Sequence, residues 1–308
     1  MSAENFGDRL RDACRARGPA CVGLDPRWAD LPEAIRRAHG EDLEGRAAAV
    51  LEFNGRVLDV VAPLVAAVKP QVAFYEALGA PGWRCYLETV AAARARGLLV
   101  VADVKRGDIG STAEAYAEAH LDLAGADAVT LNPYLGRDSL EPFLERCRGA
   151  GRGAFVLVKT SNPGSADLQD LEVGNLRVHE EVAVMLRGWA HEDGLVGRSG
   201  WSALGAVVGA THPSELASLR KMLPGVPFLV PGYGAQGGSA SDAAGAFDAR
   251  GEGAVVNSSR GILFAFRSGP GKERHGEARW ERAVEEATVA MRDALRAAIP
   301  SAPPGPAR

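Results

Sequence analysis

Cysteine is scarce in this sequence, and long apolar runs are absent from it. The four cysteines, Cys14, Cys21, Cys85 and Cys147, form no C-x-x-C pair and have no histidine at metal-site spacing. We therefore expect free thiols in a reducing compartment rather than a disulfide framework or a zinc site. No segment approaches the roughly 18 apolar residues of a membrane span, and residues 1–17 are charged and helical in pattern, unlike a signal peptide. These features predict a cytoplasmic protein.

A large excess of either charge is also missing. Lys and Arg number 35 and Asp and Glu number 39, which gives a formal net charge of −4. No global positive field is therefore available to hold a nucleic acid polymer or an anionic membrane. The proportions of hydrophobic residues, 46%, and charged residues, 24%, are ordinary for a soluble globular enzyme. Any anionic ligand must be held by a local site.

Short apolar runs alternate with helix-like segments along the chain, a pattern typical of parallel α/β folds. Eight such runs are predicted strands: residues 20–24, 65–69, 98–103, 128–131, 154–159, 205–209, 227–230 and 253–257. One barrel of eight strand-helix units needs about 250 residues, and the chain has 308. We predict a single-domain (β/α)8 TIM barrel over residues 1–299 and a Pro- and Ala-rich, disordered tail at 300–308.

Helices are predicted between the strands, where apolar residues recur at a period near 3.6. Val50, Asn54, Val57 and Val61 form one such stripe, which should face the core. Ser111 or Thr112 is expected to cap one helix, and the segment from Ser239 another. Three stretches exceed the minimal repeat, and we expect lids, binding loops or tolerated insertions there. They are residues 26–45, 160–172 and 267–277.

Charged residues stand at the carboxyl ends of the first three predicted strands. Asp25 follows the first strand, Lys69 ends the second, and Asp103 ends the third, with Lys105 and Asp108 close behind. Side chains two positions apart on an extended segment point the same way, so Asp103 and Lys105 should lie beside Lys69 of the neighbouring strand. Asp108 would extend this group to four alternating charges. Because an unpaired buried charge is costly, the group is either a ligand site or a structural ion-pair network.

Groups suited to a phosphorylated heterocycle follow later strands. The turn 160–164 carries polar side chains for a heterocycle edge. The glycine-rich segment 231–238 precedes a predicted helix, whose amides and dipole favour a phosphate. Arg260 follows the eighth strand and adds a guanidinium. Loops after strands seven and eight form the usual phosphate site of such barrels.

The glycine-rich segment also matches a dinucleotide-binding pattern. Gly232, Gly234 and Gly237 give G-x-G-x-x-G. A dinucleotide fold would place this pattern early in the chain, with an acidic residue about 20 positions on. Asn257 stands at that distance instead, so we favour the phosphate interpretation.

Residues 100–113, VVADVKRGDIGSTA, resemble the signature of the orotidine 5′-phosphate decarboxylase family, with two aspartates, a lysine, an isoleucine and a threonine at fixed spacing. The resemblance continues through GLDPR at 23–27, KPQVAFYEALG at 69–79, TLNPYLGRDSLEPF at 130–143, KTSNPGS at 159–165, VPGYGAQGG at 230–238 and NSSRGI at 257–262. It spans nearly the whole chain, and its length and its KPQ and NPYLG segments resemble the longer bacterial subfamily. It implies a decarboxylase that converts orotidine 5′-phosphate to UMP and CO₂, the last step of de novo pyrimidine nucleotide synthesis. No cofactor or metal is implied.

The resemblance also implies a role for each residue of the charged group. Asp103 would sit against the substrate carboxylate, and Lys105 would deliver the proton to C6. Lys69 would bridge Asp103 and the ribose hydroxyls, and Asp25 would hold the ribose. Fixed opposite charges beside Lys105 should keep its ammonium protonated at neutral pH.

Further positions match contacts to the base, the phosphate and a second subunit. Ser161 would bond the pyrimidine, Pro231 and Gln236 belong to the loop that closes over base and phosphate, and Arg260 would grip the phosphate. Ile109 belongs to the signature and suits a pyrimidine nucleotide. Asp108 and Thr112 would reach into the partner's site, which implies a homodimer. Ser259 departs from the shorter form of the family, where glycine precedes the arginine.

Three other functions stay open at this point. A magnesium-dependent sugar-phosphate decarboxylase or synthase of the same barrel superfamily shares D-x-K-x-x-D. A Schiff-base aldolase would use Lys105 or Lys159. A non-catalytic nucleotide-binding barrel would keep the phosphate loop and lack the chemistry.

Overall fold

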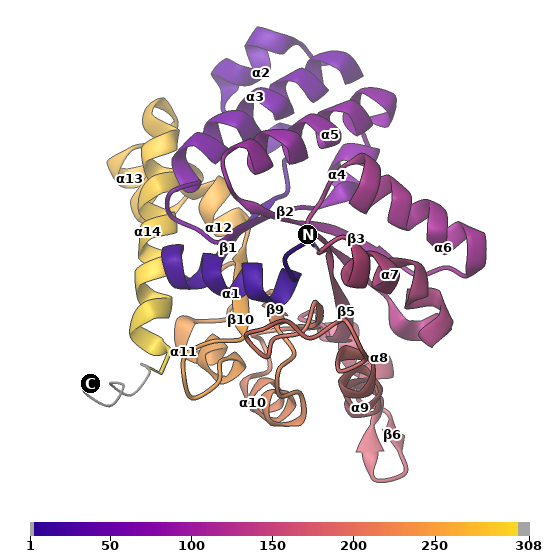
Figure 1. Cartoon of the computed structure of the whole chain (residues 1–308). Coiled ribbons are helices and arrows are strands. Elements are labelled where there is room, and N and C mark those ends of the chain that lie inside the picture. Colours follow the sequence, from indigo (N-terminus) through magenta and orange to yellow (C-terminus); the bar gives the residue numbers. More distant parts are fainter. Residues whose placement is uncertain (1–2, 301–308) are drawn as a thin grey trace, which may run out of the picture.

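Eight parallel strands close into a barrel in the computed structural model, which describes residues 3–300 (Figure 1). The barrel strands are β1 (Ala20–Leu24), β2 (Ala67–Pro70), β3 (Leu99–Arg106), β4 (Ala128–Leu131), β5 (Gly153–Lys159), β8 (Leu204–Val208), β9 (Phe228–Val230) and β10 (Ala254–Ser258). Their order around the barrel follows the chain, and β10 pairs with β1. The predicted TIM barrel is confirmed, and every predicted strand overlaps an observed one.

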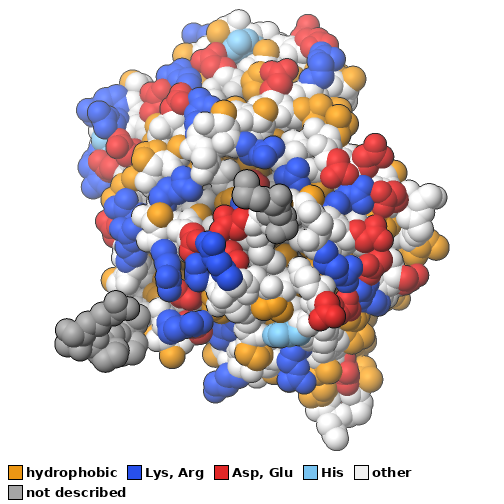
Figure 2. Space-filling view, in the orientation of Figure 1, with side chains coloured by type: hydrophobic (Ala, Val, Ile, Leu, Met, Phe, Trp, Pro, Cys, Tyr) orange, Lys and Arg blue, Asp and Glu red, His pale blue; other side chains and the backbone are white. Residues whose placement is uncertain are grey.

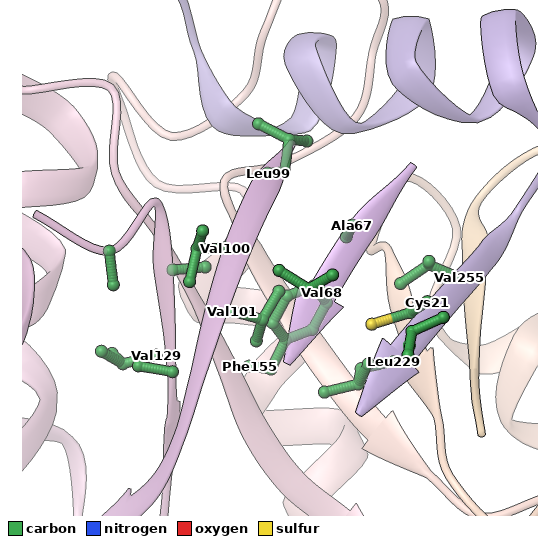
Figure 3. Packing of buried hydrophobic residues seen from close by; sticks show 14 of the residues in the cluster. Cys21, Ala67, Val68, Leu99, Val100, Val101, Val129, Phe155, Leu229 and Val255 are labelled. Atoms are coloured by element: carbon green, nitrogen blue, oxygen red, sulfur yellow. The ribbon is translucent and has the colours of Figure 1, made fainter. Parts of the chain in front are cut away.

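The strands form where the sequence is continuously apolar, because each strand is covered on both faces. All residues of β1, β2, β4, β8, β9 and β10 are buried. Cys21, Leu229 and Val255 come from three neighbouring strands and lie near one another (Figure 3). A filled barrel interior of this kind is a rigid base for groups at the strand ends.

Helices surround the barrel (Figure 1). They are α1 (Phe6–Arg17), α2 (Glu33–His39), α3 (Leu43–Val61), α4 (Val72–Glu76), α5 (Gly79–Ala95), α6 (Gly110–Ala117), α7 (Glu141–Gly149), α8 (Ala166–Gln169), α9 (Val178–Ala190), α10 (Pro213–Met222), α11 (Ala240–Ala243), α12 (Arg260–Leu263), α13 (Gly269–Arg274) and α14 (Trp280–Ala298). The predicted stripe of α3 is confirmed, since Val50, Asn54, Val57 and Val61 are buried. No helix among residues 3–300 combines the length and apolar character needed to cross a membrane.

Helix α1 lies across the amino-terminal end of the barrel. The ring of Phe6 packs edge-on against Phe155 of β5, with ring centroids 5.8 Å apart. Gly153 at the start of β5 leaves room for that ring, since a Cβ there would lie 2.2 Å from it. On the face that α1 covers, basic and acidic side chains are interspersed (Figure 2). The opposite, carboxyl-terminal end of the strands is left for a site.

The three long stretches were predicted as loops, and the structure corrects this. Residues 26–45 contain the 3₁₀ turn η1 (Trp28–Asp30) and α2, and residues 267–277 contain α13. Residues 160–172 contain η5 (Pro163–Ser165), α8 and the start of a small hairpin, β6 (Glu172–Val173) with β7 (Leu176–Arg177). These helices are too short to show a clear apolar period. The remaining short elements are η2 (Glu118–Leu123), η3 (Pro133–Leu135), η4 (Arg137–Leu140), η6 (Ala244–Ala246), η7 (Ala265–Arg267) and η8 (Glu277–Arg279).

The stretches 26–45 and 267–277 contact each other beside the β1–β10 pair of strands. Arg267 donates a hydrogen bond to the carbonyl oxygen of Ala29 at 3.1 Å, and the backbone N–H of Glu33 donates to the carboxylate of Glu277. Both stretches therefore fasten the two ends of the barrel sequence to one another.

The predicted helix caps are partly right. Ser239 caps α11, and its hydroxyl accepts a hydrogen bond from the N–H of Asp242. At α6 the prediction is wrong, because Ile109 holds the N-cap position without a side-chain bond. The helix begins at Gly110, so Ser111 and Thr112 already lie in its first turn. The predicted disordered tail, apart from Pro300, falls outside the described residues.

Candidate active site

A cavity of about 360 Å³ opens at the carboxyl ends of the strands. Most of the predicted site residues line it: Asp25, Lys69, Asp103, Lys105, Ser161, Pro231, Gln236 and Arg260. Leu157, Val207 and Leu229 supply apolar wall. Charged side chains from the first half of the barrel therefore line the same cavity as the residues of the second half that were predicted to bind phosphate.

The carboxylate of Asp103 is the centre of the charged group. Its Oδ2 accepts hydrogen bonds from Lys69 Nζ at 2.5 Å and Gln71 Nε2 at 3.0 Å. Its Oδ1 accepts from Lys105 Nζ at 2.5 Å and Thr130 Oγ1 at 3.0 Å. Each oxygen thus receives one ammonium and one neutral donor, and the predicted Lys-Asp-Lys arrangement is present.

Burial and charge act in opposite directions on these groups. Burial of Asp103 acts to raise its pKa, but the ammonium groups of Lys69 and Lys105 outweigh it and hold that pKa well below the ordinary value. Burial acts to lower the pKa of Lys69, but the carboxylates of Asp103 and Asp25 outweigh it and raise that pKa. Both residues therefore stay ionised at neutral pH. The side chain of Lys69 is 6% exposed and that of Lys105 is 46% exposed, so Lys105 is the ammonium open to a ligand.

The backbone at Lys105 is strained. Its φ is 46°, and it is the one non-glycine residue among residues 3–300 with a positive φ. The pairing of β3 with β4 shifts register at this point, between Ala102 and Arg106. Strain of about 1–3 kcal/mol per residue persists only where the surroundings impose it, and it clusters at functional sites.

The part of the cavity wall that was predicted to bind phosphate is formed by the segment 231–238 and the start of α12. Arg260 is exposed and is the first residue of α12. Gly232, Gly234 and Gly237 have φ values of 102°, 73° and 97°, which favour glycine. The N–H groups of Gly234 and Gly237 donate within the segment, to carbonyl oxygens of Gly238 and Gly234. Those two N–H groups are therefore not free to bind an anion. Fewer backbone amides of the segment than predicted are available for a phosphate.

Three predicted site residues do not line this cavity: Asp108, Ile109 and Thr112. A carboxylate oxygen of Asp108 accepts the backbone N–H of Ile109 at 2.8 Å. The side chain of Ile109 is 56% exposed, and Thr112 is exposed in the first turn of α6. Within one chain, the charged group of the cavity therefore has three members, Lys69, Asp103 and Lys105, and lacks the predicted fourth.

Several polar residues of the cavity wall were not predicted as site residues, among them Gln71, Thr130 and Asn257. Gln71 is two residues after Lys69, so the same alternation that grouped Asp103 with Lys105 identifies it. Asn257 ends the eighth predicted strand, where its position after the glycine-rich segment bears only on the dinucleotide pattern. Thr130 lies inside a buried strand, and although it begins a segment that resembles the family, the sequence assigns its side chain no role.

Lys159 is not placed for Schiff-base chemistry in this cavity. It is fully buried, its Nζ lies 2.5 Å from a carboxylate oxygen of Asp170, and it does not line the cavity. The carboxylate of Asp170 also lies 3.2 Å from His179 Nδ1. This cluster holds the stretch after β5 in place. Over residues 3–300, no three His, Cys, Asp or Glu side chains gather as a metal-binding group.

Comparisons with known proteins agree with this geometry. The family model described as "Orotidine 5'-phosphate decarboxylase / HUMPS family" matches residues 19–268. An orotidine 5′-phosphate decarboxylase of Rhodopirellula baltica is 47% identical over 94% of this chain and 99% of its own, and one of Deinococcus radiodurans is 44% identical over 91% and 92%. The solved structure of Leishmania donovani OMP decarboxylase superposes with a TM-score of 0.75 at 35% identity, covering 97% of this chain and 98% of that one. The chain belongs to the orotidine 5′-phosphate decarboxylase / HUMPS family.

Proposed function

We propose that this protein converts orotidine 5′-phosphate to UMP and CO₂, the last step of de novo pyrimidine nucleotide synthesis. The observation that carries the proposal is the half-exposed ammonium of Lys105, held 2.5 Å from the buried carboxylate of Asp103 at the cavity wall. A relative that is 47% identical over most of its length is named orotidine 5′-phosphate decarboxylase. The proposal needs no cofactor.

The reaction breaks the bond between C6 and its carboxylate and leaves the electron pair on C6. That pair lies in an sp² orbital orthogonal to the ring π-system, so delocalisation into the ring carbonyls does not relieve it. A positive charge already in place lowers the barrier without reorganisation. Lys105 supplies that charge and then its proton, which gives UMP and a neutral amine that water reprotonates.

Asp103 and Lys69 fix the position of Lys105. Asp103 is 6% exposed and its carboxylate has four hydrogen-bond donors, so its orientation is set before substrate binds. Lys69 compensates the negative charge of Asp103 at Oδ2, the oxygen that does not bond to Lys105. We assign Asp103 to the neighbourhood of the substrate carboxylate and Lys69 to the ribose side of the site.

Groups for the rest of the nucleotide line the same cavity. We assign the phosphate to Arg260 with Gln236 and Pro231 of the closing segment, and the pyrimidine to Ser161. We assign the ribose to Asp25, whose buried Oδ1 has no hydrogen-bond partner among residues 3–300. An acceptor left without a donor costs free energy, so a ribose hydroxyl is its natural partner.

The chemistry is tested by adding orotidine 5′-phosphate to the purified protein with EDTA and following the loss of its ultraviolet absorbance. We expect turnover that the chelator does not change. Turnover that requires added magnesium and a sugar phosphate would instead support the sugar-phosphate alternative. Trapping of Lys105 by borohydride with a carbonyl substrate would support an aldolase, and nucleotide binding without turnover a non-catalytic barrel.

We further propose a homodimer in which Asp108 and Thr112 enter the partner's site. Exposed apolar side chains lie near the same end of the barrel: Ile109, Tyr134 and Leu135. Large apolar side chains exposed near one another are a feature of association surfaces, and these three would be covered in such a dimer. Asp108→Ala and Lys105→Ala are each expected to be inactive, and a mixture of the two should regain activity because some sites combine intact halves. No recovery on mixing, or a monomer by sedimentation, would contradict the dimer.

A cytoplasmic location is also proposed. Cys14, Cys21, Cys85 and Cys147 are free, and burial raises the pKa of the Cys21 and Cys147 thiols to about 12. Free thiols suit a reducing compartment. Titration of the protein isolated from its source cells with a thiol reagent should detect all four thiols after unfolding. Fewer would indicate disulfide formation.

A further inference from the structure

The strained segment of β3 faces a single residue of β4. Ala102 pairs with Val129 and Arg106 pairs with Leu131. Between these pairs β3 has three residues, 103–105, and β4 has one, Thr130. A bulge of this kind removes backbone groups from the ladder and turns side chains toward a site.

The hydroxyl of Thr130 accepts the amides that the bulge releases. The N–H of Val104 donates to Thr130 Oγ1 at 3.0 Å and the N–H of Lys105 donates at 2.9 Å. The hydroxyl proton goes to Asp103 Oδ1 at 3.0 Å. A hydroxyl has two acceptor sites and one proton, so every hydrogen-bonding capacity of Thr130 is used on this bulge.

We propose that Thr130 is a positioning residue for the decarboxylation, because its hydroxyl joins the strained backbone of Lys105 to the carboxylate that holds the Lys105 ammonium. This inference rests on the proposed function. Thr130 is 1% exposed, so water cannot replace the hydroxyl. Without it, the amides of Val104 and Lys105 lack their acceptor and Asp103 Oδ1 loses its neutral donor. The ammonium then loses its fixed place opposite C6.

Thr130→Val removes the hydroxyl at nearly constant volume, and Thr130→Ser keeps it. We expect kcat of Thr130→Val to fall about tenfold to a hundredfold with little change in KM, as for loss of a buried hydrogen bond to a charged group. Thr130→Ser should retain kcat near the wild-type value. Thr288→Val is the matched control, since Thr288 is also buried and its hydroxyl bonds within α14, to Val284. It should lower Tm without changing kcat.

A second measurement does not depend on turnover. The rate at which acetic anhydride modifies Lys105, followed by peptide mass spectrometry across pH, reports how firmly the ammonium is held. We expect faster modification in Thr130→Val than in the wild type, and a wild-type rate in Thr130→Ser and Thr288→Val. An unchanged rate and an unchanged kcat in folded Thr130→Val would overturn the inference. A wild-type protein without decarboxylase activity would refute the proposed function alone, because the modification rates still test Thr130.

Discussion

Replacement of Lys105 by alanine separates chemistry from folding in this site. The side chain is 46% exposed and bonds to Asp103, which keeps Lys69, Gln71 and Thr130 as donors after the change. The pair is exposed only on the lysine side, since the Asp103 side chain is 8% exposed, so its loss should cost about 1–3 kcal/mol, as for a hydrogen bond to a charged group. Alanine is no more strained than lysine at a φ of 46°, since both carry a Cβ. Lys105→Ala should therefore still fold, with a free energy of unfolding about 1–3 kcal/mol below that of the wild type.

Its catalytic effect should be far larger. Loss of a general acid costs about 10²–10⁴ in rate, and loss of a preorganised charge costs about 10²–10³. Together they predict that kcat falls by about 10⁴–10⁷, or about 5–10 kcal/mol of transition-state stabilisation. The assay follows orotidine 5′-phosphate absorbance, with UMP binding by calorimetry to show that the site is intact. Lys221→Ala, a change at an exposed lysine of α10, is the matched control. Turnover within about a hundredfold of the wild type would refute the assignment of Lys105 as the proton donor.

Other perturbations have equally definite outcomes. Arg260→Ala should lower kcat/KM for the nucleotide by about two to four orders of magnitude, through two lost bonds to a phosphate. An equal loss with the nucleoside lacking phosphate would contradict this. Gly23→Ala places a Cβ 1.9 Å from Ser259 Oγ, beside Arg260, and should raise KM, whereas Gly55→Ala, with open space around it, should not. Burial, with a smaller effect of Arg106, lowers the pKa of His120 to about 4. Between about pH 4 and about pH 6.5 the unfolded chain therefore binds more protons at this position than the folded protein. The free energy of unfolding should consequently fall by about 2 kcal/mol from about pH 7.5 to about pH 5. His120→Phe, measured by urea unfolding, should show a smaller fall, and an equal fall would refute burial of a neutral imidazole.

The barrel and most of the cavity wall were readable from the sequence. Strands covered on both faces must be apolar throughout, and this makes each of them visible as a short run. Charged residues directly after such runs have to meet at one end of the barrel, and this predicts the location of Asp25, Lys69 and Asp103 from the sequence alone. Roles within the site came from resemblance to a family rather than from spacing.

The features that escaped prediction depend on contacts between distant parts of the chain. The register shift between β3 and β4 is a property of two strands together, so neither strand signals it and Thr130 looks like an ordinary core residue. The helix α6 starts at Gly110 because of the backbone path after β3, which overrides the cap preference of Ser111 and Thr112. Among residues 3–300 Asp108 has no charged partner, because its proposed partner belongs to the other subunit.

The contact between the stretches 26–45 and 267–277 affects how the chain can fold. Ala29 and Arg267 are bonded across most of the sequence, and Phe53 of α3 packs on Trp280 of α14 with ring centroids 5.0 Å apart. Closing contacts of such sequence separation carry a large loop-closure cost before they return any stability. During synthesis, the ribosome must therefore release nearly the whole polypeptide before β1 can pair with β10. Until then the edge of β1 stays open, and that interval is when the nascent protein is most exposed to aggregation.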